Sequence, residues 1–195
     1  MSALDANGGN FSICGVLAGD AEFSNFYNLI FRNTSKQPGA DGFRVNATGY
    51  VGARFFNCYA EDCHIGFNFN PDSIATNSQA ILLLRCGARN CTSHGIQAEE
   101  TGGPLVAIEA EETWVSNCGG DGFHELRYAF RCGASNNGGH GFSRYNSVWH
   151  CTAHGNGLSG FRQTDSFVTV AARCLATDNS QYGYQADSQD TVLIG

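Results

Sequence analysis

Apolar residues recur at every second position in several short segments of the chain. The segments FNCYA (56–60), LRCGA (84–88), FRCGA (130–134) and WHCTA (149–153) share the pattern apolar–x–Cys–x–Ala. A period of two predicts a β-strand with one buried face, and the spacings of three and four that a helix requires are missing. We therefore expect a strand at each of these segments.

A second signal, Gly followed by an aromatic residue or Ile, recurs along the chain. The marker glycines are Gly42, Gly66, Gly95, Gly122, Gly141, Gly160 and Gly183, at steps of 24, 29, 27, 19, 19 and 23 residues. Such repetition is typical of a solenoid. Each coil is expected to hold a strand ending in Cys-x-Ala, a polar turn, a second strand at the marker and a variable return. Residues 1–27 are less regular and are predicted to form an N-terminal coil or cap, followed by one continuous domain over residues 28–195.

Equivalent residues of stacked coils lie about 4.8 Å apart and form ladders. Three ladders are expected, namely Cys132, Cys151 and Cys174; Cys63, Cys91 and Cys118; and Asn137, Asn156 and Asn179. The Cβ vectors of neighbouring rungs run parallel, which suits a disulfide poorly. We therefore interpret the nine cysteines as small buried side chains, mostly free thiols kept reduced.

The motif Cys-x-Ala-x-x-x-x-Gly/Asn-x-x-Gly-Phe/Ile covers about residues 28–195 and resembles that of the right-handed parallel β-helix family, in the pectin-lyase-like superfamily. The resemblance implies an all-β fold, a right-handed parallel β-helix (solenoid) of about seven coils with repeats of 19–29 residues. It does not define a function, because this fold serves many activities.

Composition excludes some partners. The net charge of −7 argues against nucleic acid and against binding an anionic membrane. No apolar run reaches about 18 residues, so membrane insertion is not expected. The N-terminal sequence MSALDANGG has no basic region followed by an apolar one, so no signal peptide is seen.

Polar residues flank the markers. Before the marker glycines come His94, Asp121 and His140 on adjacent coils, and an Asp between two imidazoles suits general acid–base catalysis. The residues after the marker pairs should point outward as a polar strip that suits sugar hydroxyls. The predicted binding residues are Arg44, Asn68, Gln97, His124, Arg162 and Arg144.

Three interpretations of the His94, Asp121 and His140 ladder remain open: an ordinary solvated ladder, ligand contact or catalysis, and metal binding. We predict no metal site, because His94 and His140 are two rungs, about 10 Å, apart. No cofactor is predicted either.

Gly139-His140-Gly141 resembles the Gly-His-Gly signature of polygalacturonases. That family carries a pair of Asp one coil earlier, whereas this chain has the single Asp121. The later Arg-x-Lys element is missing, since the only lysine is Lys36. These departures weigh against a hydrolase that needs two carboxylates. An arginine such as Arg144 or Arg162 would still serve a lyase or epimerase.

Two insertions after the marker strand, residues 70–78 and 99–104, lengthen successive coils. They would wall a groove beside the polar strip, or they vary freely as loops on solenoids do. On the other strand, the outward residues Arg85, Glu112, Arg131, His150 and Arg173 predict alternating salt pairs, each worth roughly 0–1 kcal/mol.

No capping helix is predicted at residues 191–195, and an open end would expose strand edges. We therefore expect either that the chain is a fragment or that another subunit or domain covers this end. Phage tail spikes and fibres use trimers of such β-helices, made in a reducing cytosol without a signal peptide. We therefore predict a structural or receptor-binding module, tail spike/fibre-like, that contacts surface polysaccharide. It would be a homo-oligomer (trimer or end-to-end assembly) in a virion or another extracellular structure produced in the cytoplasm. The alternative is a polysaccharide lyase, glycoside hydrolase or epimerase that uses Asp121, His140 and His94.

Overall fold

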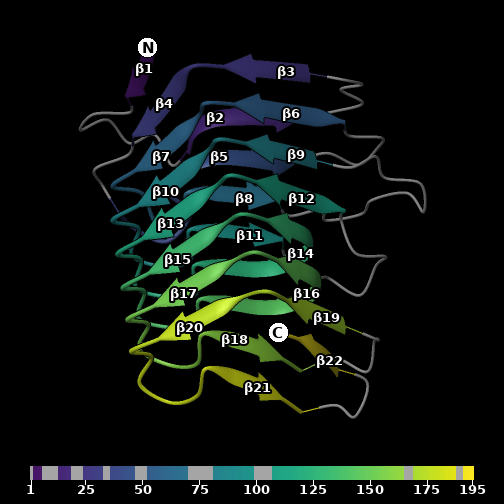
Figure 1. Ribbon diagram of the computed structural model, residues 1–195. Helices are drawn as coiled ribbons and strands as arrows, with labels where there is room; N and C mark the ends of the chain where they lie inside the picture. The colour runs from purple at the N-terminus through teal and green to yellow at the C-terminus, as the bar shows by residue number, and fades with distance from the viewer. Residues whose placement is uncertain are drawn as a thin grey trace.

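The computed structural model describes residues 2–5, 13–18, 24–32, 36–46, 52–69, 81–98, 107–164, 169–187 and 191–195. These residues form strands and turns, and none of them is helical. The strands pair in parallel and stack along one axis, so the protein is an all-β parallel solenoid (Figure 1). In the described ranges there is accordingly no helix long and apolar enough to cross a membrane.

One side of the solenoid is an eight-stranded sheet, here termed the short-strand sheet, to which each coil contributes one strand. Its strands, in spatial order, are β1 (Ser2–Asp5), β4 (Leu29–Arg32), β7 (Tyr59–Glu61), β10 (Gly87–Arg89), β13 (Trp114–Ser116), β15 (Gly133–Ser135), β17 (Thr152–His154) and β20 (Leu175–Thr177). Because a turn closely follows each strand, most of them are only three residues long.

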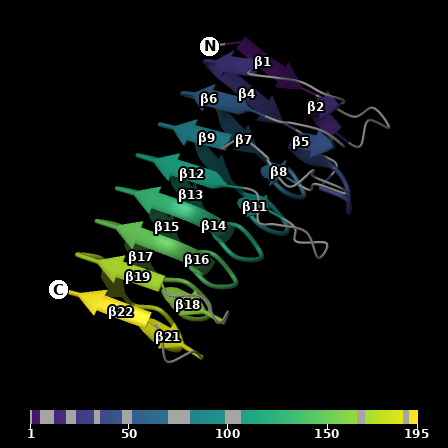
Figure 2. The ribbon, with the colours of Figure 1, turned by 90° about the vertical axis from the view of Figure 1, so that its right-hand side faces the viewer.

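The other strands form a 14-stranded sheet that bends around the remaining sides (Figures 1 and 2). Its first half, the marker ladder, contains β2 (Ile13–Ala18), β5 (Asp41–Asn46), β8 (Phe67–Phe69), β11 (Ile96–Ala98), β18 (Phe161–Gln163) and β21 (Tyr184–Ala186). Its second half contains β3 (Ser24–Tyr27), β6 (Ala53–Phe56), β9 (Ile81–Leu84), β12 (Ile108–Glu111), β19 (Thr169–Ala172) and β22 (Thr191–Ile194). The long strands β14 (Phe123–Phe130) and β16 (Phe142–Trp149) run through both halves.

The two long strands change direction in their middle. β14 pairs with β11 through Phe123 and with β12 through Phe130. Between these ends, Glu125 has a φ of 62°, and Arg144 in β16 has a φ of 54°. Left-handed backbone is uncommon for such residues, so these positions mark the bend. The two shortest coils thus replace a loop by a kinked strand.

The predicted register of the marker pairs is confirmed. Phe43, Phe67, Ile96, Phe123, Phe142, Phe161 and Tyr184 pair in this order on successive strands. The steps of 24, 29, 27, 19, 19 and 23 residues are therefore true coil repeats. The two insertions at residues 70–78 and 99–104 lie outside the described residues.

The coil count differs slightly from the predicted seven. About five turns, from β7 to β19, form the regular part, in which every strand has described side chains and a neighbour on both sides. Counting marker glycines overestimates this number because the first and last markers belong to coils near the ends. Beyond the regular part, β1, β2 and β3 pair in parallel with β4, β5 and β6, so these strands of residues 1–27 follow the same coil path. A domain boundary at residue 27 stays a prediction.

Aromatic rings of the marker ladder fill the core. Phe123, Phe142 and Phe161 are fully buried and stack with ring centroids 4.7 and 5.0 Å apart. Tyr184 continues the stack 4.9 Å from Phe161. Small side chains of the short-strand sheet belong to the same buried core, namely Ala60, Ala88, Val115, Ala134 and Ala153.

The prediction of a single strand over each apolar–x–Cys–x–Ala segment is wrong, because each segment turns a corner. One strand ends at the apolar residue, which is only half-buried, and a second strand begins after the buried cysteine; the four apolar residues are Phe56, Leu84, Phe130 and Trp149.

All eight cysteines whose side chains are described are free. Cys132 and Cys151 are buried, and their thiols donate to backbone carbonyls of the preceding coil, for example Cys132 Sγ to Ala110 O at 3.3 Å. A hydroxyl takes over this role in one coil, where Thr113 Oγ1 donates to Leu83 O at 3.2 Å. The prediction of free, packed thiols is confirmed for these residues.

The cysteines and asparagines at the turns form one continuous ladder. The amide of Cys118 donates to Asn137 Oδ1 at 3.0 Å. Asn137 Nδ2 donates to Asn156 Oδ1 at 3.0 Å, and Asn156 Nδ2 donates to Asn179 Oδ1 at 2.8 Å. The expected asparagine ladder therefore exists, and it continues the thiol ladder of the preceding coils.

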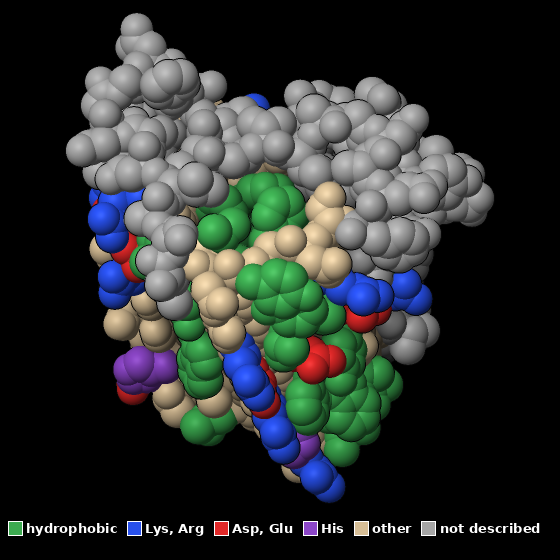
Figure 3. Space-filling view, turned by 90° about the horizontal axis from the view of Figure 1, so that it is seen from above, with side chains coloured by type: hydrophobic (Ala, Val, Ile, Leu, Met, Phe, Trp, Pro, Cys, Tyr) green, Lys and Arg blue, Asp and Glu red, His purple; other side chains and the backbone are tan. Residues whose placement is uncertain are grey.

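The residue before each strand cysteine, and before Leu29 and Thr113 at the same position of their coils, has left-handed backbone with φ between 46° and 54°. These residues are Asn28, Asn57, Arg85, Glu112, Arg131, His150 and Arg173. The predicted salt pairs form on this corner, with Arg85 Nε 2.9 Å from Glu112 Oε2 and Arg131 Nη1 3.8 Å from Glu112 Oε1. Figure 3 shows basic and acidic side chains following one another in a diagonal row across one face.

Candidate functional site

The three predicted catalytic residues lie on turns just before strands of the marker ladder, and the structure brings them into one ladder. His94 Nδ1 accepts the backbone N–H of Asp121 at 2.9 Å. Asp121 Oδ1 accepts the N–H of His140 at 2.7 Å, and His140 Nδ1 accepts that of Ser159 at 3.1 Å. Each side chain therefore binds the backbone of the next coil.

His124 completes this cluster from the start of β14. Its Nδ1–H donates to Asp121 Oδ2 at 2.8 Å, and Ser143 Oγ donates to the same oxygen at 2.6 Å. Burial alone would raise the pKa of Asp121, but hydrogen bonds from His124, Ser143 and the His140 backbone lower it to about 2. Burial likewise opposes the charged form of His124, yet hydrogen bonds to Asp121 and Glu125 raise its pKa to about 9. The two residues therefore form an ion pair at neutral pH.

The pKa values of His94 and His140 are lowered, in contrast to that of His124. Burial lowers the pKa of His94, and the charge on His124 lowers it further. Burial also lowers the pKa of His140, whose Nε2 lies 3.0 Å from Arg162 Nη1. At neutral pH both imidazoles are therefore uncharged and act as acceptors for backbone amides.

The predicted binding residues divide between this cluster and two others. Arg44 and Asn68 meet at the fully buried Asp41, with Arg44 Nη2 2.6 Å and Asn68 Nδ2 2.8 Å from Asp41 Oδ2. Arg144 lies at the bend of β16 and pairs with Glu125. His124 and Arg162 join the histidine cluster already described.

The outward strip is less exposed than the alternation predicts. Asn68 is 3% exposed and Gln97 is 9% exposed, although both follow an inward-facing residue of the marker ladder. Their buried Oδ1 and Oε1 atoms have no hydrogen-bond partner. Alternation gives the direction of a side chain but not what covers it, so the sequence could not predict this burial.

The chemistry available to the histidine cluster is limited by its own hydrogen bonds. Both carboxylate oxygens of Asp121 are engaged within the protein. The ion pair of Asp121 and His124 titrates far from neutral pH, whereas an acid–base catalyst works best with a pKa near the working pH. The geometry favours a charge network that fixes the turns, and the catalytic role of Asp121, His140 and His94 stays a prediction.

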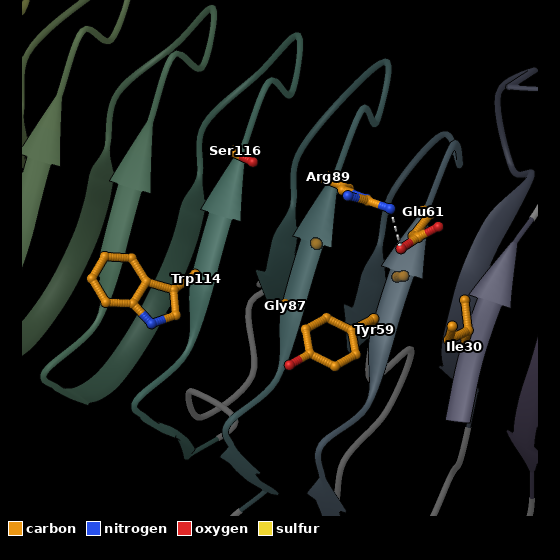
Figure 4. Close-up of a pocket in the computed structure, with 9 residues that line it drawn as sticks. Ile30, Tyr59, Glu61, Gly87, Arg89, Trp114 and Ser116 are labelled. Atoms are coloured by element: carbon orange, nitrogen blue, oxygen red, sulfur yellow. Dashed lines mark ion pairs between the residues drawn. The ribbon is translucent and has the colours of Figure 1, made fainter. Parts of the chain in front are cut away.

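A second feature lies on the outer face of the short-strand sheet, where nine residues line a hollow of about 420 Å³ (Figure 4). Two aromatic residues stand in it, Tyr59 on β7 and Trp114 on β13. Their exposed fractions are 36% and 59%, high for such large apolar side chains. Two coils, roughly 10 Å, separate their positions.

Glycines shape this hollow. Gly87 lies between Tyr59 and Trp114 in the ladder, and a β-carbon there would come within 2.9 Å of Tyr59 Cδ1. The ring of Tyr59 therefore lies over Gly87 (Figure 4). The ring of Trp114 lies in the same way over Gly133 of the next coil. Both rings thus rest on the backbone of a glycine and leave the space between them open.

A charged row borders the hollow. Glu61 Oε2 lies 2.7 Å from Arg32 Nη2, and Glu61 Oε1 lies 2.8 Å from Arg89 Nη2. The Glu61 side chain is only 9% exposed, whereas that of Arg89 is 60% exposed. Ser116 follows Arg89 in the same ladder. The hollow therefore combines two aromatic surfaces with exposed hydrogen-bond donors on one flank.

Sequence reasoning did not select Tyr59, Trp114 or Arg89. The sequence feature that could have identified them is the variable middle residue of the Cys-x-Ala motif. This residue must point outward if Cys and Ala point inward. Along the coils this position is occupied by Tyr59, Gly87, Trp114, Gly133, Thr152 and Leu175. Large aromatic residues alternating with glycine on an outer face are the observation that would have predicted the hollow.

Comparison of the chain with protein-family models, with curated proteins and with solved structures gave no match.

Proposed function

We propose that this chain is a structural or receptor-binding β-solenoid module, tail spike/fibre-like, that contacts a surface polysaccharide. The observation that carries the proposal is the hollow between Tyr59 and Trp114 on the short-strand sheet. A pyranose ring has an apolar face of C–H groups and a rim of hydroxyls. Aromatic rings stack on the apolar face of the sugar, and the exposed donors of Arg89 and Ser116 can hydrogen-bond to its hydroxyls.

The scaffold also favours recognition of an extended polymer. The residues of the hollow stand on short strands whose backbones are fixed by pairing on both sides, so little ordering is needed on binding. The two ring positions, roughly 10 Å apart, would address adjoining sugar units rather than a single one. A repeating glycan chain laid across β7, β10 and β13 is the ligand that fits this layout best.

We further propose a right-handed, pectin-lyase-like winding, since crossover connections between parallel strands are almost always right-handed. An assembly of several copies, as a trimer or end to end, belongs to the same proposal, as does its place in a virion or another structure made in a reducing cytosol. The free thiols of the described residues support a reducing site of synthesis.

The enzymatic alternative is the less favoured one. A lyase, hydrolase or epimerase would need an acid–base group free to meet substrate, whereas the carboxylate of Asp121 is held by three donors of the protein itself. The hollow, in contrast, offers exposed groups without an evident nucleophile or acid–base pair. Binding without turnover is therefore the function proposed.

A glycan array of bacterial capsular and O-antigen polysaccharides tests this function. The wild-type protein should bind a subset of the glycans and leave them uncleaved. Trp114→Ala and Tyr59→Ala should each weaken binding by about tenfold, as expected from the loss of one stacking contact. Leu175→Ala is the matched control, because Leu175 is 58% exposed and occupies the same outward position outside the hollow. No binding to any glycan, or equal loss in the control, would contradict the proposal.

A further inference from the structure

We infer that His94, Asp121 and His124 form a binding site for a divalent transition-metal ion such as Zn²⁺. Each residue offers one ligand atom, and these three atoms all lie within 4.8 Å of one another. Imidazole nitrogen and carboxylate oxygen are ligands that Zn²⁺ and its neighbours in the first transition row prefer. The inference goes beyond the proposed function, because the site lies on the marker ladder and not on the short-strand sheet.

The geometry needs only a small rearrangement, in which His94 moves closer and the Asp121–His124 pair opens slightly. The imidazole rings of His94 and His124 lie 4.8 Å apart between centroids and are tilted by 31°. The Asp121 Oδ2 to His124 Nδ1 distance is 2.8 Å, and at bond lengths of about 2.0–2.2 Å an ion between two such ligands would hold them slightly over 3 Å apart. The ion would take the place of the proton that Asp121 and His124 now share. His94 would approach through its Nε2, because its Nδ1 accepts the Asp121 amide.

A second observation points to a cation at this place. Glu125 follows His124 directly, its side chain is 3% exposed, and its buried Oε2 has no hydrogen-bond partner. Its other oxygen, Oε1, lies 3.6 Å from His124 Nε2. On the preceding coil, Gln97 pairs in register with His124 and carries a buried, unpartnered Oε1. Glu125 also pairs with Arg144 and is not one of the proposed ligands, but an ion on His124 would bring positive charge toward both of these buried acceptors that have no donor.

This site differs from the ladder of His94, Asp121 and His140 that the sequence indicates. Ladder spacing places His94 and His140 two rungs apart, which excludes their sharing an ion with Asp121. His124 removes this obstacle, because it stands three residues after Asp121 on the same coil and reaches back to it. Ligands then come from only two adjacent coils, that of His94 and that of Asp121 and His124, so a bound ion would cross-link them.

The test uses the full chain, freed of metal with EDTA and titrated with Co²⁺ and then Zn²⁺. We expect one ion per chain, a rise in melting temperature because only the folded state assembles the site, and visible Co²⁺ bands typical of nitrogen and oxygen ligands. Strong near-ultraviolet thiolate-to-cobalt bands would place the ion on cysteines and would overturn the inference. No binding to the wild-type protein would overturn it as well.

Two variants locate the ion. His94→Gln keeps an acceptor for the Asp121 amide, and we expect it to weaken Co²⁺ binding at least about tenfold. His124→Gln serves as a second ligand variant if the first does not fold. His154→Gln is the matched control, since His154 is exposed on β17, away from the cluster, and pairs with Thr177. Equal weakening in control and ligand variants, or none in folded ligand variants, would contradict the site. We expect these changes to leave glycan binding at Trp114 unaltered, so the two proposals fail separately.

Discussion

The indole of Trp114 lies directly over Gly133, its partner on the next coil. A β-carbon at Gly133 would come within 2.0 Å of Trp114 Cε3 and Cζ3, far inside van der Waals contact. The glycine therefore sets the position of the ring on the outer face of the short-strand sheet. The proposed glycan surface depends on this pair as much as on the aromatic residue itself.

Gly133→Ala should displace the Trp114 ring with little effect on stability, because an exposed side chain moves more easily than backbone. We expect a shift of the tryptophan fluorescence maximum, a melting temperature within a few degrees of wild type, and glycan affinity lowered about two- to tenfold by the lost stacking contact. Thermal unfolding and a glycan titration would measure this. Unchanged fluorescence together with unchanged affinity would show that the pair does not set the ring position.

Asn156→Ala should strongly destabilise the solenoid. The buried side chain accepts the backbone and side-chain N–H groups of Asn137 at 3.2 and 3.0 Å, and its Nδ2 donates to Ala134 O and Asn179 Oδ1. Leaving several buried partners unsatisfied costs about 3 kcal/mol or more. Urea unfolding would measure the loss, with the exposed amide variant Gln181→Ala as control. A loss below about 1 kcal/mol would argue against a structural asparagine ladder.

Arg173→Asn should leave the fold intact and raise its stability. Arg173 is exposed and has a φ of 50°, a backbone region that Asn tolerates better than Arg. Asn28 and Asn57 already occupy the equivalent corner in earlier coils. We expect a gain of up to about 1 kcal/mol in the free energy of unfolding, whereas the β-branched Arg173→Val should destabilise. A stabilising Val variant would contradict the assigned backbone conformation.

Stability should fall as the pH rises from about 6.5 to about 9. Burial disfavours charged His124, but hydrogen bonds to Asp121 and Glu125 raise its pKa to about 9, against 6.5 for a free histidine. The folded protein keeps a proton that the unfolded chain releases, so the contribution is complete below pH 6.5 and is lost through pH 9. It amounts to at most about 3 kcal/mol. Urea unfolding in EDTA would measure it, and His124→Gln should remove most of the pH dependence. The same slope in that variant would assign the effect to other groups.

Much of the fold could be predicted from the sequence because one-dimensional repeats place equivalent residues in contact. The marker pairs Phe123, Phe142 and Phe161 are in register as expected, since a period-two strand with one buried face allows no slip of a single residue. The left-handed backbone at the corners could not be predicted in this way. Nothing in the residue type of Arg131 or Arg173 predicts left-handed backbone, which the neighbouring coils impose.

The site was predictable only in part. Spacing brought His94 and Asp121 together, but it could not show that their side chains bind backbone amides of the next coil. The role of His124 depends on a hydrogen bond back across the turn to Asp121. Patterns of titratable residues do not indicate a role for Trp114, because an exposed aromatic side chain carries no titratable group.

The most direct test of glycan recognition is a fluorescence titration of a protein in which Trp114 is the only tryptophan. The chain has two tryptophans, so Trp149→Phe leaves Trp114 as the sole reporter. Adding a polysaccharide selected by the array should change the indole emission in a saturable way, with the same midpoint as binding measured by calorimetry. Binding by calorimetry without any change in Trp114 emission would contradict the account.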